Sequence, residues 1–436
     1  MLFSRPRAFR PGAFRPRALA ASAVILAFGL HGAPAGAAHA DAQQPPAAST
    51  PPLSPQTASP QAATPQTATP QAAPPQRPRV QSPVIDAGRV TFSVYAPKAA
   101  AVTLNSGEIN RLVPGPHAFT RGADGVWSVS VGPLPPAIYD YSFDIDGVVM
   151  TDPESPDVFG NRRGARGFVE VPGPAGKPRR DEWQSVPHGA VTAHWYDSKT
   201  TGTRRRVHVY TPPGYESDAT RRYPVLFLLH GSGDNDSHWT LLGRANVIAD
   251  NLIASRAAQP LIIVMPDGHP YTAPPATPRD VARRTAAERF ESDLLTDVVP
   301  LVERTYRIER GRDARAIAGL SMGGGQALYV GLRHTDRIAW IGGFSSSAQT
   351  LDHVLPDVRK QASNINANAR LVWIRIGTDD FLLAQNRTFI DELKSAGIRH
   401  EYVETEGAHM WGVWRGYLAD LLPRLFQKGP KTQAAR

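Results

Sequence analysis

Residues 319–323 read Gly-Leu-Ser-Met-Gly and directly follow an apolar run, which predicts a strand that turns sharply into a helix at Ser321. Gly-x-Ser-x-Gly is the pattern of a nucleophile elbow, in which a strained turn exposes the serine hydroxyl. Flanking glycines leave room for such a turn. Small-residue packing at a strand-to-helix turn produces the same pattern, so partner residues must decide whether Ser321 is a nucleophile.

Two candidate partners follow predicted strands nearer the C-terminus. One apolar strand ends in Gly-Thr-Asp-Asp, which places Asp379 and Asp380 at its carboxyl end, where open α/β sheets hold their functional groups. A later strand leads into a loop that carries His409. Serine, carboxylate and histidine follow each other in this order in α/β-hydrolases. We therefore interpret Ser321 as a nucleophile, His409 as its base and one of the two aspartates as the acid.

A third element precedes the serine. The apolar run 223–229 is too short for a buried helix and predicts a central strand, which ends at His-Gly-Ser-Gly in positions 230–233. In α/β-hydrolases this turn supplies one amide of the oxyanion hole, and the residue after the nucleophile supplies the other. We assign these donors to the backbone N–H groups of Ser232 and Met322. Four such elements at strand ends, in one chain order, argue against coincidental packing.

The first forty residues predict a signal peptide. Five arginines precede residue 18, an apolar stretch too short to span a bilayer covers 18–30, and Ala-His-Ala stands at 38–40. We expect cleavage before Asp41 and residence in the periplasm or outside the cell, with no membrane span in the mature protein.

Composition limits the possible partners and cofactors. Removal of the five leader arginines lowers the formal charge from +9 to +4, so the charge does not indicate a nucleic-acid partner. The 436 residues include no cysteine, which fits export, and no Cys/His cluster has metal-ligand spacing. We expect neither a metal nor a cofactor.

The mature chain divides into segments of different composition. Residues 41–82 are rich in Pro, Ala, Gln and Thr and predict an extended, disordered linker. Short alternating strands with Asp-Gly turns in 83–172 predict a small Ig-like β-sandwich, in which alternation favours a core position for Trp127. Strands and helices alternate in 187–428 and predict a doubly wound, mostly parallel sheet of the α/β class. Residues 429–436 are expected to form a disordered tail.

Several further segments carry a family resemblance over nearly all of 83–428. They include Tyr-Thr-Pro-Pro-Gly-Tyr at 210–215, Val-Met-Pro-Asp-Gly-His at 264–269 and His-Met-Trp at 409–411. With the elbow, these segments resemble carbohydrate esterase family 1, the feruloyl and acetyl-xylan esterases, which lies close to enterochelin esterases and bacterial esterase D. The resemblance implies an α/β-hydrolase fold, a carboxylic ester substrate that is attached to polysaccharide, and Asp380 as the acid.

The preceding sandwich has a resemblance of its own. Gly-Val-Trp-Ser-Val at 125–129, Tyr-Asp-Tyr at 139–141 and Asp-Pro at 152–153 resemble the glycogen-binding-like module of family 48. In such esterases this module often packs against the catalytic domain instead of holding glycan. We therefore expect it to shape the cleft rather than to bind free sugar.

Substrate contacts are harder to assign from the sequence. Trp239 and Trp411 are candidates for stacking on a phenolic acyl group or a sugar, although tryptophan near a strand end is as often simply packed. His269, which follows a strand end, is a candidate for the pocket rim and has an equally good structural explanation.

Two other functions remain compatible with these residues. One is a periplasmic siderophore esterase acting on catecholate lactones, which shares the hydrolase and the leading β-domain. The other is a glycan-binding protein with a vestigial hydrolase fold, which the intact set of Ser321, Asp380 and His409 argues against. An acyltransferase is a lesser variant of the serine esterase, because an acceptor alcohol competes with water for the same acyl-enzyme.

Overall fold

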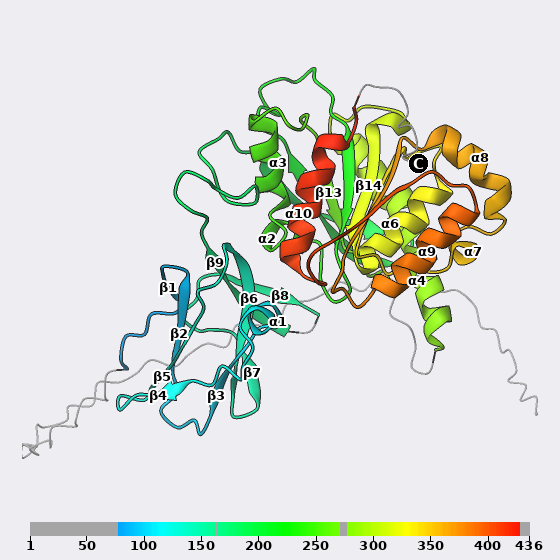
Figure 1. Cartoon of the computed structure of the whole chain (residues 1–436). Coiled ribbons are helices and arrows are strands. Elements are labelled where there is room, and N and C mark those ends of the chain that lie inside the picture. Colours follow the sequence, from blue (N-terminus) through cyan, green and yellow to red (C-terminus); the bar gives the residue numbers. More distant parts are fainter. Residues whose placement is uncertain (1–76, 163, 271–276, 428–436) are drawn as a thin grey trace, which may run out of the picture. The chain divides into compact units, whose positions relative to one another are not determined.

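The computed structural model describes residues 77–162, 164–270 and 277–427 (Figure 1), which all belong to one compact unit. The predicted signal peptide, the linker up to residue 76 and the tail 429–436 lie outside the described residues. Within the described part of the chain, no helix is long and apolar enough to cross a membrane.

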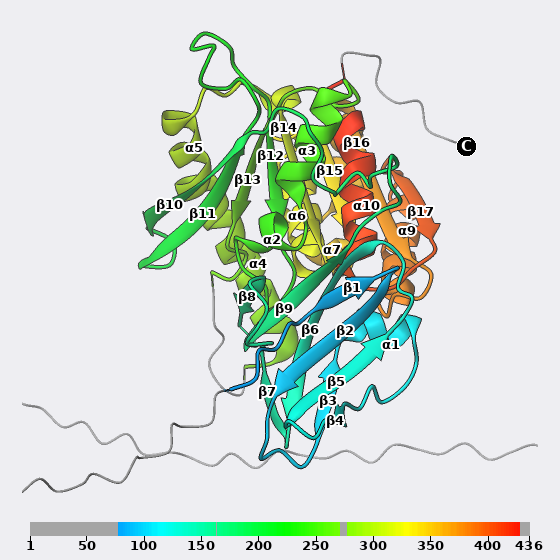
Figure 2. The same cartoon turned by 90° about the vertical axis from the view of Figure 1, so that its left-hand side faces the viewer.

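An eight-stranded mixed sheet forms the centre of the larger, C-terminal part. Its spatial order is β10 (Ala190–Ser198), β11 (Thr203–Thr211), β13 (Ile262–Pro266), β12 (Val225–Leu229), β14 (Arg315–Leu320), β15 (Trp340–Phe344), β16 (Leu371–Gly377) and β17 (Glu401–Thr405). The pairs β10–β11 and β11–β13 are antiparallel, and all following pairs are parallel. Figure 2 shows β10 at one edge of the sheet and β17 at the other. The expected mostly parallel sheet is confirmed, and its first strands pair in antiparallel fashion.

Helices cover both faces of this sheet. They are α2 (His238–Leu241), α3 (Ala245–Ala254), α4 (Arg279–Asp293), α5 (Val299–Thr305), α6 (Met322–Arg333), α7 (Leu351–Val354), α8 (Val358–Asn368), α9 (Leu383–Ser395) and α10 (Trp411–Leu421), with short turns at Leu294–Val298, Arg312–Ala314 and Leu422–Arg424. Strand β12 shows why both faces need cover: Phe227 belongs to one apolar cluster with α6 and α9, whereas Leu228 belongs to another with α3 and α10. Successive side chains of a strand point to opposite faces, so a fully apolar strand must be buried on both.

The segment from Arg279 to Thr305 is not one continuous α-helix. Helix α4 begins at Arg279, a π-helical turn covers Leu294–Val298, and α5 follows with Pro300 in its first turn. Proline lacks an amide hydrogen and is tolerated only in the first turn of a helix. This explains why no regular α-helix continues from α4 past Pro300.

The N-terminal part contains two antiparallel sheets. One has the order β1 (Val84–Asp86), β2 (Arg89–Tyr95), β5 (Val126–Val131) and β4 (Thr120–Arg121); the other has β3 (Val102–Asn105), β6 (Ala137–Ile145), β9 (Gly164–Val171) and β8 (Val158–Asn161), with β7 (Val148–Met150) on β6. The short helix α1 (Gly107–Leu112) follows β3.

A separate apolar cluster joins the two N-terminal sheets. Phe92 from one sheet lies 4.5 Å from Tyr141 of the other, measured between ring centroids. Trp127 belongs to the same core, as expected, and its indole N–H donates to Ala96 O. The classification of this part as an Ig-like or family 48-type module, and the boundary residues 83 and 172, stay predictions.

Candidate active site

Ser321 stands at the junction between β14 and α6. Its φ of 53° and ψ of −114° are strained for a residue with a side chain, as expected of a nucleophile elbow. The two flanking glycines are required by close approach of the backbone. A Cβ atom at Gly319 would lie 2.6 Å from the carbonyl of Gly323, and one at Gly323 would lie 2.5 Å from His230 O. Gly-x-Ser-x-Gly therefore has a steric reason at each glycine.

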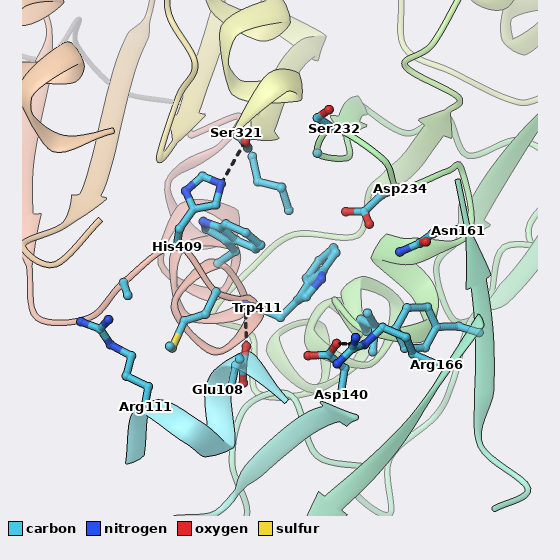
Figure 3. A pocket seen from close by; sticks show the side chains of 18 of the residues that line it. Glu108, Arg111, Asp140, Asn161, Arg166, Ser232, Asp234, Ser321, His409 and Trp411 are labelled. Carbon is cyan, nitrogen blue, oxygen red and sulfur yellow. Dashed lines mark hydrogen bonds and ion pairs between the residues drawn. The ribbon is translucent and has the colours of Figure 1, made fainter. Parts of the chain in front are cut away.

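Ser321, His409 and Asp380 form a continuous hydrogen-bonded series. His409 Nε2 lies 3.0 Å from Ser321 Oγ, and Nδ1 lies 3.0 and 2.9 Å from the two carboxylate oxygens of Asp380 (Figure 3 shows the first of these contacts). The carboxylate beside Nδ1 favours the tautomer with its proton on that nitrogen, which leaves Nε2 free to accept the serine proton. This geometry suits general-base activation of a hydroxyl.

Asp380, and not Asp379, contacts the histidine. Asp380 is 4 % exposed, whereas the Asp379 side chain is more than half exposed and pairs with Arg111 at 2.7 Å. Burial raises the pKa of Asp380, but hydrogen bonds from His409, the Leu382 N–H and Ser345 outweigh burial and hold the pKa below its ordinary value. The buried carboxylate is therefore ionised at neutral pH.

Two further residues support this series, and both escaped the sequence analysis. Ser345 follows β15, hydrogen-bonds to Asp380 and accepts the indole N–H of Trp414 at 3.0 Å. Phe381 is 75 % exposed, and its ring centroid lies 4.4 Å from that of His409. Three serines directly after a buried strand, at 345–347, were the available signal for Ser345. No pattern distinguished Phe381 from a packed residue.

The turn after β12 lies beside the serine. Ser232 lines the same pocket as Ser321, and Met322 is the first residue of α6, where helix amides lack intrahelical acceptors. Buried His230 accepts the Gly268 N–H at 2.7 Å, and His269 accepts the Gly233 N–H at 3.2 Å. Burial is the largest cause that lowers the pKa of His269 to about 4, so this imidazole is neutral and able to accept. Two histidines thus hold the turn in place.

A pocket of about 850 Å³ opens above Ser321. On the hydrolase side its lining includes Ser232, Asp234, Phe381 and Trp411. The N-terminal part, its helix α1 included, contributes Glu108, Arg111, Asp140, Asn161 and Arg166 (Figure 3). Side chains from both parts of the chain therefore face one cavity.

Of the three predicted substrate contacts, only Trp411 lines this pocket. Trp239 is 1 % exposed, donates its indole N–H to Leu229 O and packs edge-on against Trp411, so it belongs to the core. His269 lines a different hollow with Arg162 and Arg205, behind the turn that it holds. A residue close to a strand end can point into the sheet core as easily as into the cleft, and the sequence does not distinguish the two.

Among the described residues, no three His, Asp or Glu side chains are grouped so as to hold a metal ion.

Comparison with known proteins identifies the family. Residues 198–425, more than half of the chain, match the Esterase family, whose description reads "Putative esterase". The chain belongs to the Esterase family. It is 29 % identical over 356 residues to an endo-1,4-beta-xylanase/feruloyl esterase of Xylanibacter ruminicola. The matched region covers 79 % of this chain and 46 % of that protein. It is 26 % identical over 268 residues to an esterase of Mycobacterium tuberculosis, which covers 50 % of this chain and 56 % of that protein. This esterase thus spans about half the length of the curated relatives that it matches.

Solved structures show the same fold. A CE1 ferulic acid esterase of Anaeromyces mucronatus, in complex with ferulic acid, superposes with a TM-score of 0.51 and 24 % identity, covering 57 % of this chain and 94 % of that one. An enterochelin esterase of Shigella flexneri superposes with a TM-score of 0.57 and 18 % identity. The superposition covers 78 % of this chain and 92 % of that one. The chain has the α/β-hydrolase fold.

Proposed function

We propose that this esterase is an exported serine esterase that cleaves feruloyl or acetyl esters on plant polysaccharide such as xylan, through an acyl-enzyme on Ser321. The observation that carries the proposal is the hydrogen-bonded series from Ser321 Oγ through His409 to Asp380. A relative whose name includes feruloyl esterase, that of Xylanibacter ruminicola, supports the choice of substrate.

In the first step, His409 Nε2 takes the Ser321 proton while Oγ bonds to the ester carbonyl carbon. The backbone N–H groups of Ser232 and Met322 donate to the resulting oxyanion. The bond to the alcohol then breaks, and the alcohol leaves with the proton from His409. In the second step, His409 takes a proton from water, the hydroxide attacks the acyl carbon, and Ser321 leaves with that proton. Asp380 stabilises the imidazolium in both steps.

Proton transfer also indicates which part of the pocket holds the alcohol. A leaving alcohol must lie within hydrogen-bond reach of His409 Nε2 to receive its proton. Phe381, which packs on the histidine ring, is an exposed aromatic surface on this side. The polar residues of the N-terminal sheets, such as Arg166 and Asp140, face the same cavity. A hydroxyl-rich alcohol such as a sugar suits an aromatic surface next to charged hydrogen-bonding groups.

A siderophore-type esterase is a second candidate. The observation that favours it is the larger coverage of the Shigella flexneri enterochelin esterase, 78 % of this chain, compared with 57 % for the ferulic acid esterase. At 18 % identity this likeness concerns the fold alone.

The decisive experiment compares wild type with Ser321→Ala on methyl ferulate, acetylated xylan, feruloylated arabinose and an iron-loaded catecholate lactone. Ser321→Ala should lower kcat by about 10⁴- to 10⁶-fold, because the series acts as a unit. Turnover by Ser321→Ala within tenfold of wild type would disprove the serine mechanism. Hydrolysis of the lactone without action on the ferulate or xylan esters would select the siderophore candidate.

Export has a test of its own. N-terminal sequencing of the protein recovered from culture fractions should find Asp41 as the first residue. If the protein were recovered only in the cytoplasmic fraction and still carried the leader, the proposed export would be contradicted.

A further inference from the structure

Helix α1 of the N-terminal part contacts both loops that carry the acid and the base of the hydrolase. Glu108 contacts Trp411, which follows His409 by two residues (Figure 3). Arg111 contacts Asp379, the residue that precedes Asp380. These contacts join residues 303 and 268 positions apart in the chain. One short helix therefore connects the N-terminal sheets to both ends of the His409–Asp380 pair.

Glu108 caps the helix that begins directly after the histidine loop. Its Oε1 accepts the Trp411 N–H at 3.0 Å, and the carboxylate also accepts the Gly412 N–H. Trp411 and Gly412 are the first two residues of α10, and the side chain of the N-cap residue, Met410, makes no cap hydrogen bond. The first amides of a helix need acceptors, and its positive end favours a carboxylate. Glu108 meets this requirement from another part of the chain.

Arg111 holds the other loop. Its Nη2 lies 2.7 Å from Asp379 Oδ2, while the Asp379 N–H donates to Gly407 O at 2.9 Å. Asp379 is thus tied both to α1 and to the histidine loop. Because His409 must hold its hydrogen bonds to Ser321 and Asp380 at once, small movements of either loop change both distances.

The surroundings of Glu108 make this carboxylate costly to bury. Burial is the largest cause that raises the pKa of Glu108 to about 7, and nearby Asp140 raises it further, whereas Arg415 and the two amides lower it. Arg415 is itself shared, because it pairs with Asp181 at 2.7 Å and donates to Leu242 O and Ile138 O. Burial destabilises the ionised form of Glu108, and a buried charge needs compensating interactions. The hydrogen bonds to the first amides of α10 provide them.

We propose that Glu108 and Arg111 are positioning residues for the ester hydrolysis, so that the N-terminal part acts on the reacting groups through α1. This inference rests on the proposed serine mechanism. It predicts that loosening α1 lowers the reactivity of Ser321 towards small reagents that touch no part of the N-terminal sheets.

The test measures the rate at which a small alkyl fluorophosphonate labels Ser321. In this reaction Ser321 Oγ bonds to phosphorus, fluoride leaves and the hydroxyl proton passes to His409, so the rate reports the alignment of serine and histidine without a leaving sugar. Wild type should be labelled and Ser321→Ala should not. This first comparison tests the proposed mechanism by itself, whatever the Glu108 variants do.

Glu108→Ala should slow labelling by about 10- to 100-fold, as expected for a displaced catalytic group. Glu108→Gln keeps an acceptor oxygen for Trp411 and should recover most of that loss. Arg111→Ala removes an exposed pair and should slow labelling by about two- to fivefold. The matched control is Arg77→Ala, which breaks another exposed ion pair of the N-terminal part, Arg77–Glu154 at 2.8 Å. The reagent should label Ser321 in this variant at the wild-type rate.

Thermal unfolding of each variant separates positioning from stability. Labelling per folded molecule should fall in Glu108→Ala at a temperature well below its Tm, with a smaller fall in Arg111→Ala. If both variants label at the wild-type rate per folded molecule, α1 only stabilises the protein and the inference is wrong. Arg111 is exposed, so its variant stays informative even if Glu108→Ala fails to fold.

Discussion

Gly377 and Gly407 approach so closely that a Cβ atom at position 377 would lie 2.1 Å from the Gly407 carbonyl oxygen. Gly377 ends β16, three residues before Asp380, and Gly407 lies two residues before His409. This backbone contact therefore sets the spacing between the two loops that must bring the carboxylate to the imidazole. A side chain at position 377 would force one of the loops to move.

Gly377→Ala should accordingly lower kcat for p-nitrophenyl acetate by about tenfold or more, because misplacement of a catalytic group on the order of 1 Å is costly. The control is Gly416→Ala in α10, where an added Cβ meets no atom within 4 Å. Alanine favours a helix over glycine by about 1 kcal/mol, so this variant should keep its kcat and unfold at a slightly higher temperature. Equal kcat values for the two variants would contradict the role of the contact.

Ser345 provides a second prediction, about the support of Asp380. Its hydroxyl hydrogen-bonds to Asp380 and accepts from Trp414, while its φ of 46° is unfavourable for a residue with a side chain. Ser345→Gly removes the hydroxyl and relieves the backbone, whereas Ser345→Ala removes the hydroxyl alone. Both should lower kcat by about three- to tenfold, since each loses one hydrogen bond to a charged group.

The two variants should differ in stability. Ser345→Gly should be the more stable one in urea unfolding at pH 7, because glycine accepts the positive φ. The pKa of Asp380 lies below its unfolded value, so this carboxylate stabilises the fold above that unfolded value and the contribution is lost as the pH falls through the folded pKa. Loss of the Ser345 donor should therefore reduce stability at pH 7 more than at pH 3. A wild-type kcat in Ser345→Gly would show that the hydroxyl does not position Asp380.

The candidate catalytic residues were predictable because each stands where a strand ends. Ser321, Asp380 and His409 all follow strands of one sheet, and parallel strands bring their carboxyl ends to one edge. The choice of Asp380 over Asp379 came from the family resemblance, since the spacing alone allowed both. The structure places only Asp380 at the histidine.

The residues around these groups were less predictable, for two physical reasons. Trp239 and His269 lie near strand ends like the catalytic candidates, but the direction of a loop side chain depends on packing that no local pattern records. Glu108 acts on α10 from 303 residues away, so no spacing in the sequence could connect them. Long-range contacts between the N-terminal sheets and the hydrolase therefore required the structure.

Phe381 yields a prediction about the alcohol side of the substrate. Its ring is 75 % exposed beside His409, where the leaving alcohol takes its proton in the proposed mechanism. Phe381→Ala should raise KM for a feruloylated arabinoxylan oligosaccharide by about three- to tenfold, as expected for loss of one stacking contact. KM for methyl ferulate should change less, because its alcohol has no surface to stack. Phe381→Tyr keeps the ring and serves as the control; equal effects of Phe381→Ala on both esters would place Phe381 on the acyl side instead.

His269 yields a prediction about acid stability. Burial, with smaller contributions from His230 and Arg162, lowers the pKa of His269 from 6.5 to about 4. The unfolded chain therefore binds a proton between these two values while the folded protein does not, so the free energy of unfolding falls as the pH falls from 6.5 to 4. His269→Gln offers an amide oxygen to the Gly233 N–H and cannot titrate. Urea unfolding should thus lose less stability between pH 6.5 and pH 4.5 in His269→Gln than in wild type.

The slope should not vanish in that variant, because burial lowers the pKa of His238 to about 4 as well and this histidine contributes in the same direction. At pH 7 the variant should keep its kcat, since His269 lies behind the turn and not in the pocket with Ser321. At pH values near 4, protonated His269 can no longer accept from Gly233 in wild type, and the variant should retain the larger fraction of its activity. Identical stability slopes in the two proteins would mean that His269 is not neutral in the folded state, and the turn before Ser232 would then need another anchor.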